Sequence, residues 1–282
     1  MASTDLFSAG DYRASVGGER RIALKFGAGW CSMCDDLDRA VLSTSVGAAL
    51  FEPLAAYAID FDRSREVATR YAILELPTVV VLDRAGVEVG RIVGFEDPRA
   101  WIEDARAAIA ADDPLPGLRK EVERGELSAL VALGEALLSR EPDEGVAMLE
   151  RASFGDGKES SRALWALARF HHRVKEDPAT ARFLWQQLAL RWPDSADAWW
   201  WYAKAQSEVG RVELGSAGFA AWADREPDSV EPLAEWTRFA GRQKYEPARA
   251  QIRARAMAAL PRARGPKREA LEELVMQLGR AF

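Results

Sequence analysis

The stretch Trp30-Cys31-Ser32-Met33-Cys34 holds the only two cysteines of the chain, three residues apart. Before it, residues 22–26 (IALKF) form a short apolar run typical of a buried strand, and Gly27 and Gly29 permit a sharp exit from that strand. After it, apolar residues recur at helical spacing from Asp35 to Leu50. The stretch therefore predicts a strand, a tight turn and a helix that starts at the cysteines.

The position at a helix N-terminus predicts a reactive thiol at Cys31. The helix dipole and the free N–H groups of the first turn favour the thiolate, which is the form that attacks disulfides. Cys34 follows one turn later and can displace the resulting mixed disulfide. We expect Cys31 to be exposed and both cysteines to be catalytic.

Two alternatives compete with redox chemistry at this pair, a zinc half-site and an inert pair. Zinc needs about four ligands, and apart from the two cysteines the chain offers only His171 and His172 as soft ligands. These histidines fall late in an expected helix, where packing or a surface position explains them. We expect no metal and no cofactor other than the redox-active cysteine pair.

With these residues in place the sequence resembles the thioredoxin superfamily. Leu76-Pro77-Thr78 precedes an apolar strand about 45 residues after the cysteine motif, where such proteins keep a cis-proline, and Gly94 matches the glycine that ends their last hairpin. The chain is most similar to the C-terminal domain of bacterial thiol:disulfide interchange reductases, on Asp36-Leu-Asp38 and Phe61-Asp-Arg63.

This resemblance implies roles for the residues around the pair. Trp30 covers the cysteines, and Pro77 presents an adjacent backbone edge, with Leu76 and Thr78, to a bound protein segment. The expected clients are proteins captured through mixed disulfides.

The residue Lys25 departs from the family pattern, which has a buried aspartate in the strand that leads into the motif. An ammonium group near the pair favours thiolates, whereas the carboxylate of Asp35 and of its acidic neighbours disfavours them. Lys25 and Asp35 are thus candidates for tuning the thiols. Alternatively, Lys25 snorkels from an edge strand to solvent.

The rest of the first domain follows from local signals. We expect a four-stranded sheet without the usual first edge strand, and three helices besides the one after the cysteines. The strands are expected at residues 21–26, 56–61, 78–83 and 87–93, and the helices at 9–17 with Ser8 as N-cap, at 64–71, and from Asp97-Pro98 to about 111.

The Pro/Gly-rich break at residues 113–117 predicts a domain boundary. The thioredoxin-like α/β domain would span residues 1–112. Residues 118–282 are rich in Ala, Leu, Arg and Trp and helical in pattern, which predicts an all-α domain.

A repeat of 34 residues runs through this second part. Pro193-Asp-Ser195 recurs as Pro227-Asp-Ser229, and a third proline follows at Pro261. The period resembles that of tetratricopeptide (TPR) repeats, which are pairs of antiparallel helices. Two triplets of core positions fall in register: Trp165, Trp199 and Leu233, and Leu188, Trp222 and Ala256.

The same alignment predicts the helix pairs. The first regular pair is expected over 162–193, an irregular pair over 127–153 and a closing helix over 266–282. Asp177-Pro178 and Glu246-Pro247 are expected to start second helices.

The TPR phase also predicts a groove for a protein or peptide partner. Aromatic and basic side chains would line it, which suits an acidic or C-terminal carboxylate segment. The predicted groove residues are Phe170, Arg173, Trp200, Lys204 and Arg238. Alternatively, Trp200 packs between repeats or against the first domain.

The composition is that of a globular protein, with 48% hydrophobic and 29% charged residues among 282. The net charge of −6 comes from residues 1–112, with 12 basic and 18 acidic groups, while residues 113–282 hold 26 of each. Nucleic-acid binding therefore gains no support. The N-terminus lacks the pattern of a secretory signal and no long apolar run occurs, so we expect a cytoplasmic protein without membrane contact.

The sequence thus predicts a thioredoxin-like protein-disulfide reductase in cell redox homeostasis, with a TPR-like array that docks protein partners. The alternative is a non-catalytic adaptor or redox-sensitive scaffold that uses the same fold and repeats for protein binding.

Overall fold

The computed structural model describes residues 6–279 and divides the chain into two compact units between Ala152 and Ser153. The first unit contains a mixed four-stranded sheet, and the regular elements of the second unit, up to Gly279, are all helices. The predicted order, an α/β part followed by a helical array, is confirmed.

The four expected strands all form, each within one or two residues of its predicted bounds. Their order in the sheet is β2-β1-β3-β4, with β1 parallel to β2 and antiparallel to β3, and β3 antiparallel to β4. The strands are β1 (Ile22–Gly27), β2 (Ala55–Asp60), β3 (Thr78–Leu82) and β4 (Glu88–Val93).

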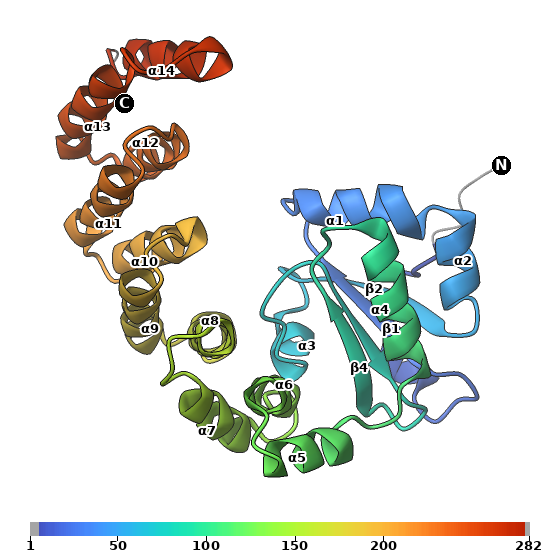
Figure 1. Ribbon diagram of the computed structural model, residues 1–282. Helices are drawn as coiled ribbons and strands as arrows, with labels where there is room; N and C mark the ends of the chain where they lie inside the picture. Colours follow the sequence, from blue (N-terminus) through green and yellow to red (C-terminus); the bar gives the residue numbers. More distant parts are fainter. Residues whose placement is uncertain (1–5, 280–282) are drawn as a thin grey trace. The chain divides into compact units, whose positions relative to one another are not determined.

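Helices cover both faces of this sheet (Figure 1). Because side chains alternate along a strand, Ala23 of β1 packs toward one helical layer and Leu24 toward the other. The first layer holds α1 (Ser32–Leu37), η2 (Asp38–Leu42), α2 (Ser45–Phe51) and α4 (Pro98–Ala110); the second holds α3 (Arg65–Arg70).

The expectation of one helix from Asp35 to Leu50 is wrong. α1 passes into the π-helical segment η2, and a new helix, α2, starts after Thr44. The hydroxyl of Thr44 donates to the carbonyl of Val41 at 2.6 Å and accepts from the N–H of Gly47 at 3.3 Å. This side chain therefore caps α2 and turns the chain between the two helices.

The expectation of a helix over 9–17 capped by Ser8 is also wrong. Ser8 forms a parallel bridge with Tyr57 of β2, since its N–H donates to the carbonyl of Ala56 and its carbonyl accepts from Ala58, both at 3.0 Å. Only a short 3₁₀ turn, η1 (Tyr12–Ser15), follows. On this edge of β2, the carbonyl of Ala56 and the N–H of Ala58 are thus hydrogen-bonded by a single residue, Ser8, at the place where a full edge strand would lie.

Three helices follow the sheet in the first compact unit: α5 (Leu115–Glu123), α6 (Leu127–Leu137) and α7 (Pro142–Ala152). The loop after α6 holds them to β4, because Arg140 donates to the carbonyl of Glu88 and Ser139 donates to the Glu88 carboxylate at 3.1 Å. All-helical structure begins near the predicted linker 113–117, yet the compact unit extends to Ala152. The functional division of the chain at that linker stays a prediction.

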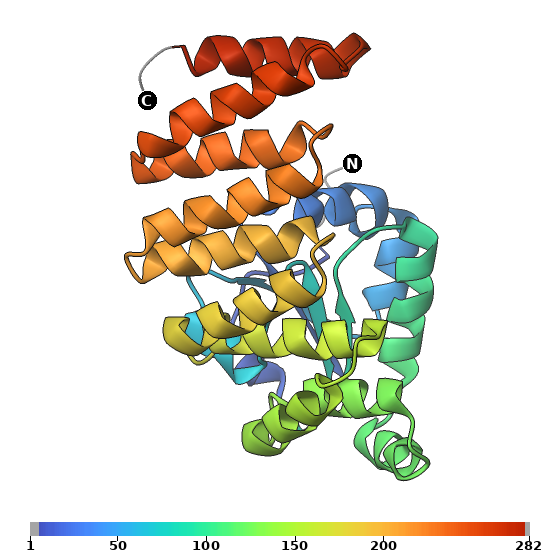
Figure 2. The same ribbon diagram turned by 60° about the vertical axis from the view of Figure 1, so that its left-hand side comes forward.

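The second unit is a stack of helical hairpins (Figure 2). The prolines Pro178 and Pro247 are the first residues of α9 and α13, as predicted. α9, α11 and α13 begin 34 and 35 residues apart, so the sequence period corresponds to one hairpin. The helices are α8 (Lys158–Arg173), α9 (Pro178–Arg191), α10 (Ala196–Glu208), α11 (Val212–Arg225), α12 (Glu231–Gln243), α13 (Pro247–Ala259) and α14 (Gly265–Gln277).

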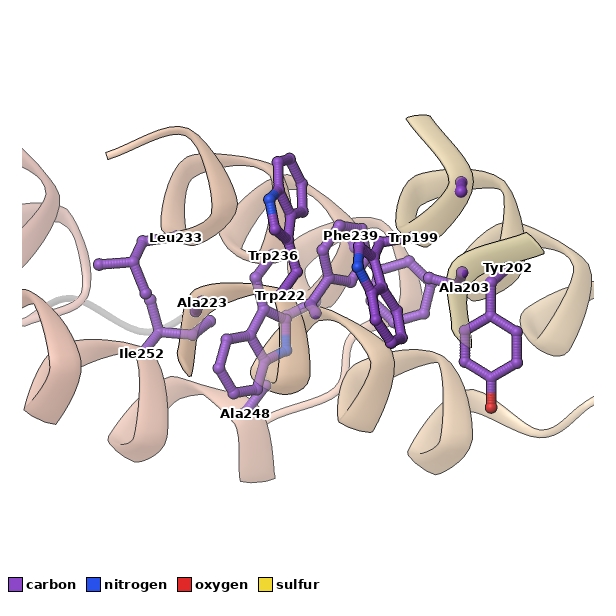
Figure 3. Packing of buried hydrophobic residues seen from close by; sticks show 14 of the residues in the cluster. Trp199, Tyr202, Ala203, Trp222, Ala223, Leu233, Trp236, Phe239, Ala248 and Ile252 are labelled. Atoms are coloured by element: carbon purple, nitrogen blue, oxygen red, sulfur yellow. The ribbon is translucent and has the colours of Figure 1, made fainter. Parts of the chain in front are cut away.

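Aromatic residues fill the core of this stack (Figure 3). Trp185, Trp222 and Trp236 are fully buried, and the indole N–H of Trp236 donates to the hydroxyl of Ser216 at 2.8 Å. Both in-register triplets predicted from the period belong to this cluster, with Trp165 partly buried at its edge.

We predict that Gly215→Ala lowers the free energy of unfolding by about 1–2 kcal/mol. A Cβ there would lie 2.8 Å from the carbonyl oxygen of Ala203 and 2.8 Å from the ring of Phe239, so α10, α11 and α12 must separate. The steric cost of the added methyl group exceeds the gain from the higher helix propensity of alanine over glycine, which is about 1 kcal/mol. Urea unfolding followed by tryptophan fluorescence measures it, since eight of the ten tryptophans lie after Ser153.

The control is Ala217→Gly on the exposed side of the same helix, which measures the helix preference alone. Stabilisation by Gly215→Ala would show that the hairpin has room at this contact.

Candidate functional site

The two cysteines form a disulfide at the start of α1. Cys31 is the N-cap residue of this helix, and its Sγ accepts the backbone N–H of Cys34 at 3.1 Å. An N–H aimed at the sulfur stabilises negative charge on it once the disulfide is reduced. The predicted position of Cys31 at a helix start is therefore confirmed.

Both sulfur-bearing side chains are recessed. Cys31 is 6% exposed and Cys34 4%, so the expectation of an exposed Cys31 is wrong for the oxidised form. Cys34 packs against the end of β1, because a Cβ at Gly27 would lie 3.6 Å from its Sγ. This is an ordinary van der Waals distance, so the start of α1 packs directly against the end of β1.

Trp30 is 60% exposed, and its indole N–H donates to the carboxylate of Asp62 at 2.8 Å. A hydrogen bond across 32 residues fixes this large apolar surface beside the cysteines. Sequence reasoning missed Asp62 as a site residue, although Phe61-Asp-Arg63 carries part of the family resemblance. The position of Asp62 just after β2 is the signal that could have identified it.

The Leu76–Pro77 bond is cis, as predicted. The pairing of Phe26 with Thr78 brings Pro77 to the end of the sheet where β1 leads into the cysteine motif. The N–H of Gly94 donates to the carbonyl of Pro77 at 2.8 Å. Thr78 is buried with its hydroxyl bonded to Glu75, and Leu76 is partly buried, so these residues offer a partner mainly their backbone.

Lys25 forms an ion pair with Asp38 of η2. The snorkelling alternative is wrong, because β1 is a central strand and the Lys25 side chain is only 13% exposed. Since Lys25 and Gly27 share one face of β1, the pair lies on the face that Cys34 contacts. Asp35, by contrast, is exposed, where solvent screens its effect.

Of the predicted groove residues, the structure brings three together. Trp200, Lys204 and Arg238 line one pocket between α10 and α12. Arg173 lies over the ring of Trp201 at 5.5 Å, and Lys204 lies over the same ring at 4.5 Å.

Phe170 is fully buried, so its assignment to the groove is wrong. It lies among the buried residues of α8, together with Ala166 and Leu167. Sequence reasoning missed Glu208, Glu235 and Arg242 of the pocket, although two of them follow predicted residues by one helical turn: Glu208 follows Lys204, and Arg242 follows Arg238.

The histidines take part in local pairs. His172 bonds the carboxylate of Glu208 at 2.6 Å, and Nδ1 of His171 lies 3.7 Å from Asp177. Within residues 6–279 no group of three or more His, Cys, Asp or Glu side chains could hold a metal ion. Over the same residues, no helix combines the length and apolarity needed to cross a bilayer.

No protein-family model matches the sequence, and no curated protein sequence matches it. Among solved structures, the chain is similar to the thioredoxin Mala s 13 of Malassezia sympodialis, at 22% sequence identity. The match covers 35% of this chain and 88% of that one, with a TM-score of 0.29.

We predict that the two partners of the buried ion pair act on the thiols in opposite directions. Asp38→Asn leaves the Lys25 ammonium without its counter-charge, so in the reduced protein thiolate should form at lower pH. Lys25→Gln leaves the carboxylate instead, so thiolate should form at higher pH. Thiolate absorbance in the ultraviolet, followed against pH, measures both.

Asp36→Asn is the control for Asp38→Asn. Asp36 pairs with Arg39 at the surface, so this substitution removes the same charge two residues earlier without touching the buried ion pair. A shift in the same direction for both test variants would show that the ion pair serves folding and not the thiols.

Proposed function

We propose that this protein is a thiol:disulfide oxidoreductase that acts on protein disulfides through Cys31 and Cys34. The observation that carries the proposal is the hydrogen bond from the Cys34 N–H to the Cys31 sulfur at the N-terminus of α1. This arrangement favours the thiolate of the residue that attacks and places the second cysteine one turn away.

The reaction consists of two thiol–disulfide exchanges. The Cys31 thiolate attacks one sulfur of a client disulfide, a Cys31–client bond forms, and the other client sulfur leaves as a thiolate that takes a proton. Cys34 then loses its proton and attacks Cys31, which restores the Cys31–Cys34 disulfide and releases the second client thiol. The client gains two electrons, and a dithiol reductant regenerates the enzyme.

The remaining residues support capture of a protein client. The exposed face of Trp30, held by Asp62, offers apolar contact beside the pair. The backbone around Pro77, at the same end of the sheet, offers strand-like pairing to an extended segment. The helical array would hold a partner at a second place, as its TPR-like period suggests.

A second candidate is the adaptor or redox-sensitive scaffold. The burial of Cys31 in the oxidised form favours it, because a recessed sulfur limits attack by an external thiol. In that case the disulfide would open only with a change in the surrounding structure, and no turnover would follow.

We predict that the purified protein accelerates the reduction of insulin by dithiothreitol, because Cys31 is poised as a thiolate after reduction. Cys31→Ser should lower the rate to that of dithiothreitol alone. Turbidity from the released insulin B chain measures it. A wild-type rate equal to that of dithiothreitol would reject turnover and leave the adaptor function.

Cys34→Ser keeps the nucleophile and removes the resolving thiol, so it should accumulate a covalent complex with the client. Non-reducing electrophoresis detects this complex, and Cys31→Ser/Cys34→Ser is its control.

A further inference from the structure

A pocket of about 260 Å³ opens between α10 and α12 of the helical array. The indole of Trp200 and the ring of Phe239 supply its apolar surface. Its polar lining is Lys204, Ser207, Glu208, Glu235, Arg238, Arg242 and Gln243.

The charges in this pocket are unbalanced toward positive. Both carboxylates are already engaged: Glu208 bonds His172 at 2.6 Å, and Glu235 accepts the indole N–H of Trp200 at 3.1 Å and pairs with Arg238 at 2.8 Å. The side chain of Arg242 has no hydrogen bond or ion pair with any residue the structure describes. The pocket therefore holds more cationic donors than its own carboxylates occupy.

The surroundings of Lys204 show the same excess of positive charge. Its Nζ lies 3.9 Å from Glu208, a weak contact for an ion pair. Burial lowers the pKa of Lys204, and the guanidinium groups of Arg173, Arg169 and Arg242 lower that pKa further, against the opposing effect of Glu208. An anion in the pocket would relieve this crowding of positive charge.

We propose that this pocket docks an acidic segment of a partner protein, with its carboxylates on Lys204, Arg238 and Arg242 and an apolar side chain against Trp200. Charge complementarity identifies the partner: the site is cationic on a chain whose net charge is −6, so general charge attraction does not explain it.

The dimensions favour a segment over a small ligand. The volume lies below the roughly 300–1,000 Å³ typical of small-molecule sites, so the pocket receives a side chain while the rest of the ligand lies across its mouth. The cations are spread over α10 and over two turns of α12, and Arg173 of α8 extends them past Trp201. This spread fits several carboxylates along a chain better than one terminal carboxylate.

The inference deepens the partner-docking part of the proposed function. Peptide binding needs no thiol chemistry, so its failure is distinguishable from failure of the redox activity.

The test is fluorescence anisotropy of the full chain with a short labelled peptide rich in glutamate and aspartate around one leucine, blocked at both ends. We predict saturable binding that weakens as salt rises, and no binding of the peptide with glutamine and asparagine in place of the acids. Lys204→Glu/Arg238→Glu should weaken binding at least about tenfold, since it replaces two charge-assisted contacts with repulsion between like charges.

A milder variant, Arg238→Gln/Arg242→Gln, changes only exposed residues and covers the case in which the first variant does not fold. The matched control is Arg253→Glu/Lys267→Glu, which makes the same change in charge on α13 and α14, away from the pocket.

Four outcomes would overturn the proposal. The first two are equal binding of the neutral peptide and undiminished binding by the folded pocket variants. A third is binding only when the peptide has a free C-terminal carboxylate, which would indicate an end-recognition site. The last is competition by citrate or phosphate at the peptide's own concentration, which would indicate a small-anion site.

Discussion

The close approach of α1 to the end of β1 is the constraint on which the cysteine site depends. Cys34 packs beside Gly27, with its Sγ 3.6 Å from the position that a Cβ of that residue would take, so the first turn of the helix lies directly on the strand. That contact fixes the turn through which the Cys34 N–H reaches the sulfur of Cys31. The register of β1 against β3 then brings Pro77 to the same end of the sheet. The strand, the helix start and the proline thus meet at one end of the sheet.

The ion pair of Lys25 and Asp38 places two opposite charges on the face of β1 that Cys34 contacts. A lone ammonium in this place would be costly to bury, and η2 resolves the problem by carrying Asp38 onto Lys25. A π-helical turn shifts the following residues around the helix axis, which re-aims side chains without breaking the helix. The two charges of the pair offset one another, so a change to either partner alone would leave an uncompensated charge on this face of β1.

Much of this could be predicted from local signals. The strands, the helix that begins at Asp97-Pro98 and the prolines at helix starts need only neighbouring residues, and the structure places them as expected. The errors come from tertiary partners: Ser8 pairs with β2, 48 residues away, and Thr44 ends a helix whose apolar pattern continues. Phe170 was misplaced because a repeat phase gives the helix face and not the depth of each side chain. The pocket was predictable only in part, since Glu235 gains its role from the indole of Trp200.

The two candidate sites have complementary physical demands. The rate of thiol–disulfide exchange depends on the sulfur atoms and their accessibility, so a recessed cysteine pair by itself discriminates little between client sequences. A charged pocket with an aromatic wall instead discriminates by the amino-acid composition of the bound segment. Solvent and salt screen its charges, which keeps such binding weak. In one chain, occupation of the second site raises the effective concentration of the bound partner near the first, a gain that reaches about 10²–10⁴ when geometry permits both contacts. Under the proposed function, weak docking would be an advantage, because it would select clients and still release them after reduction.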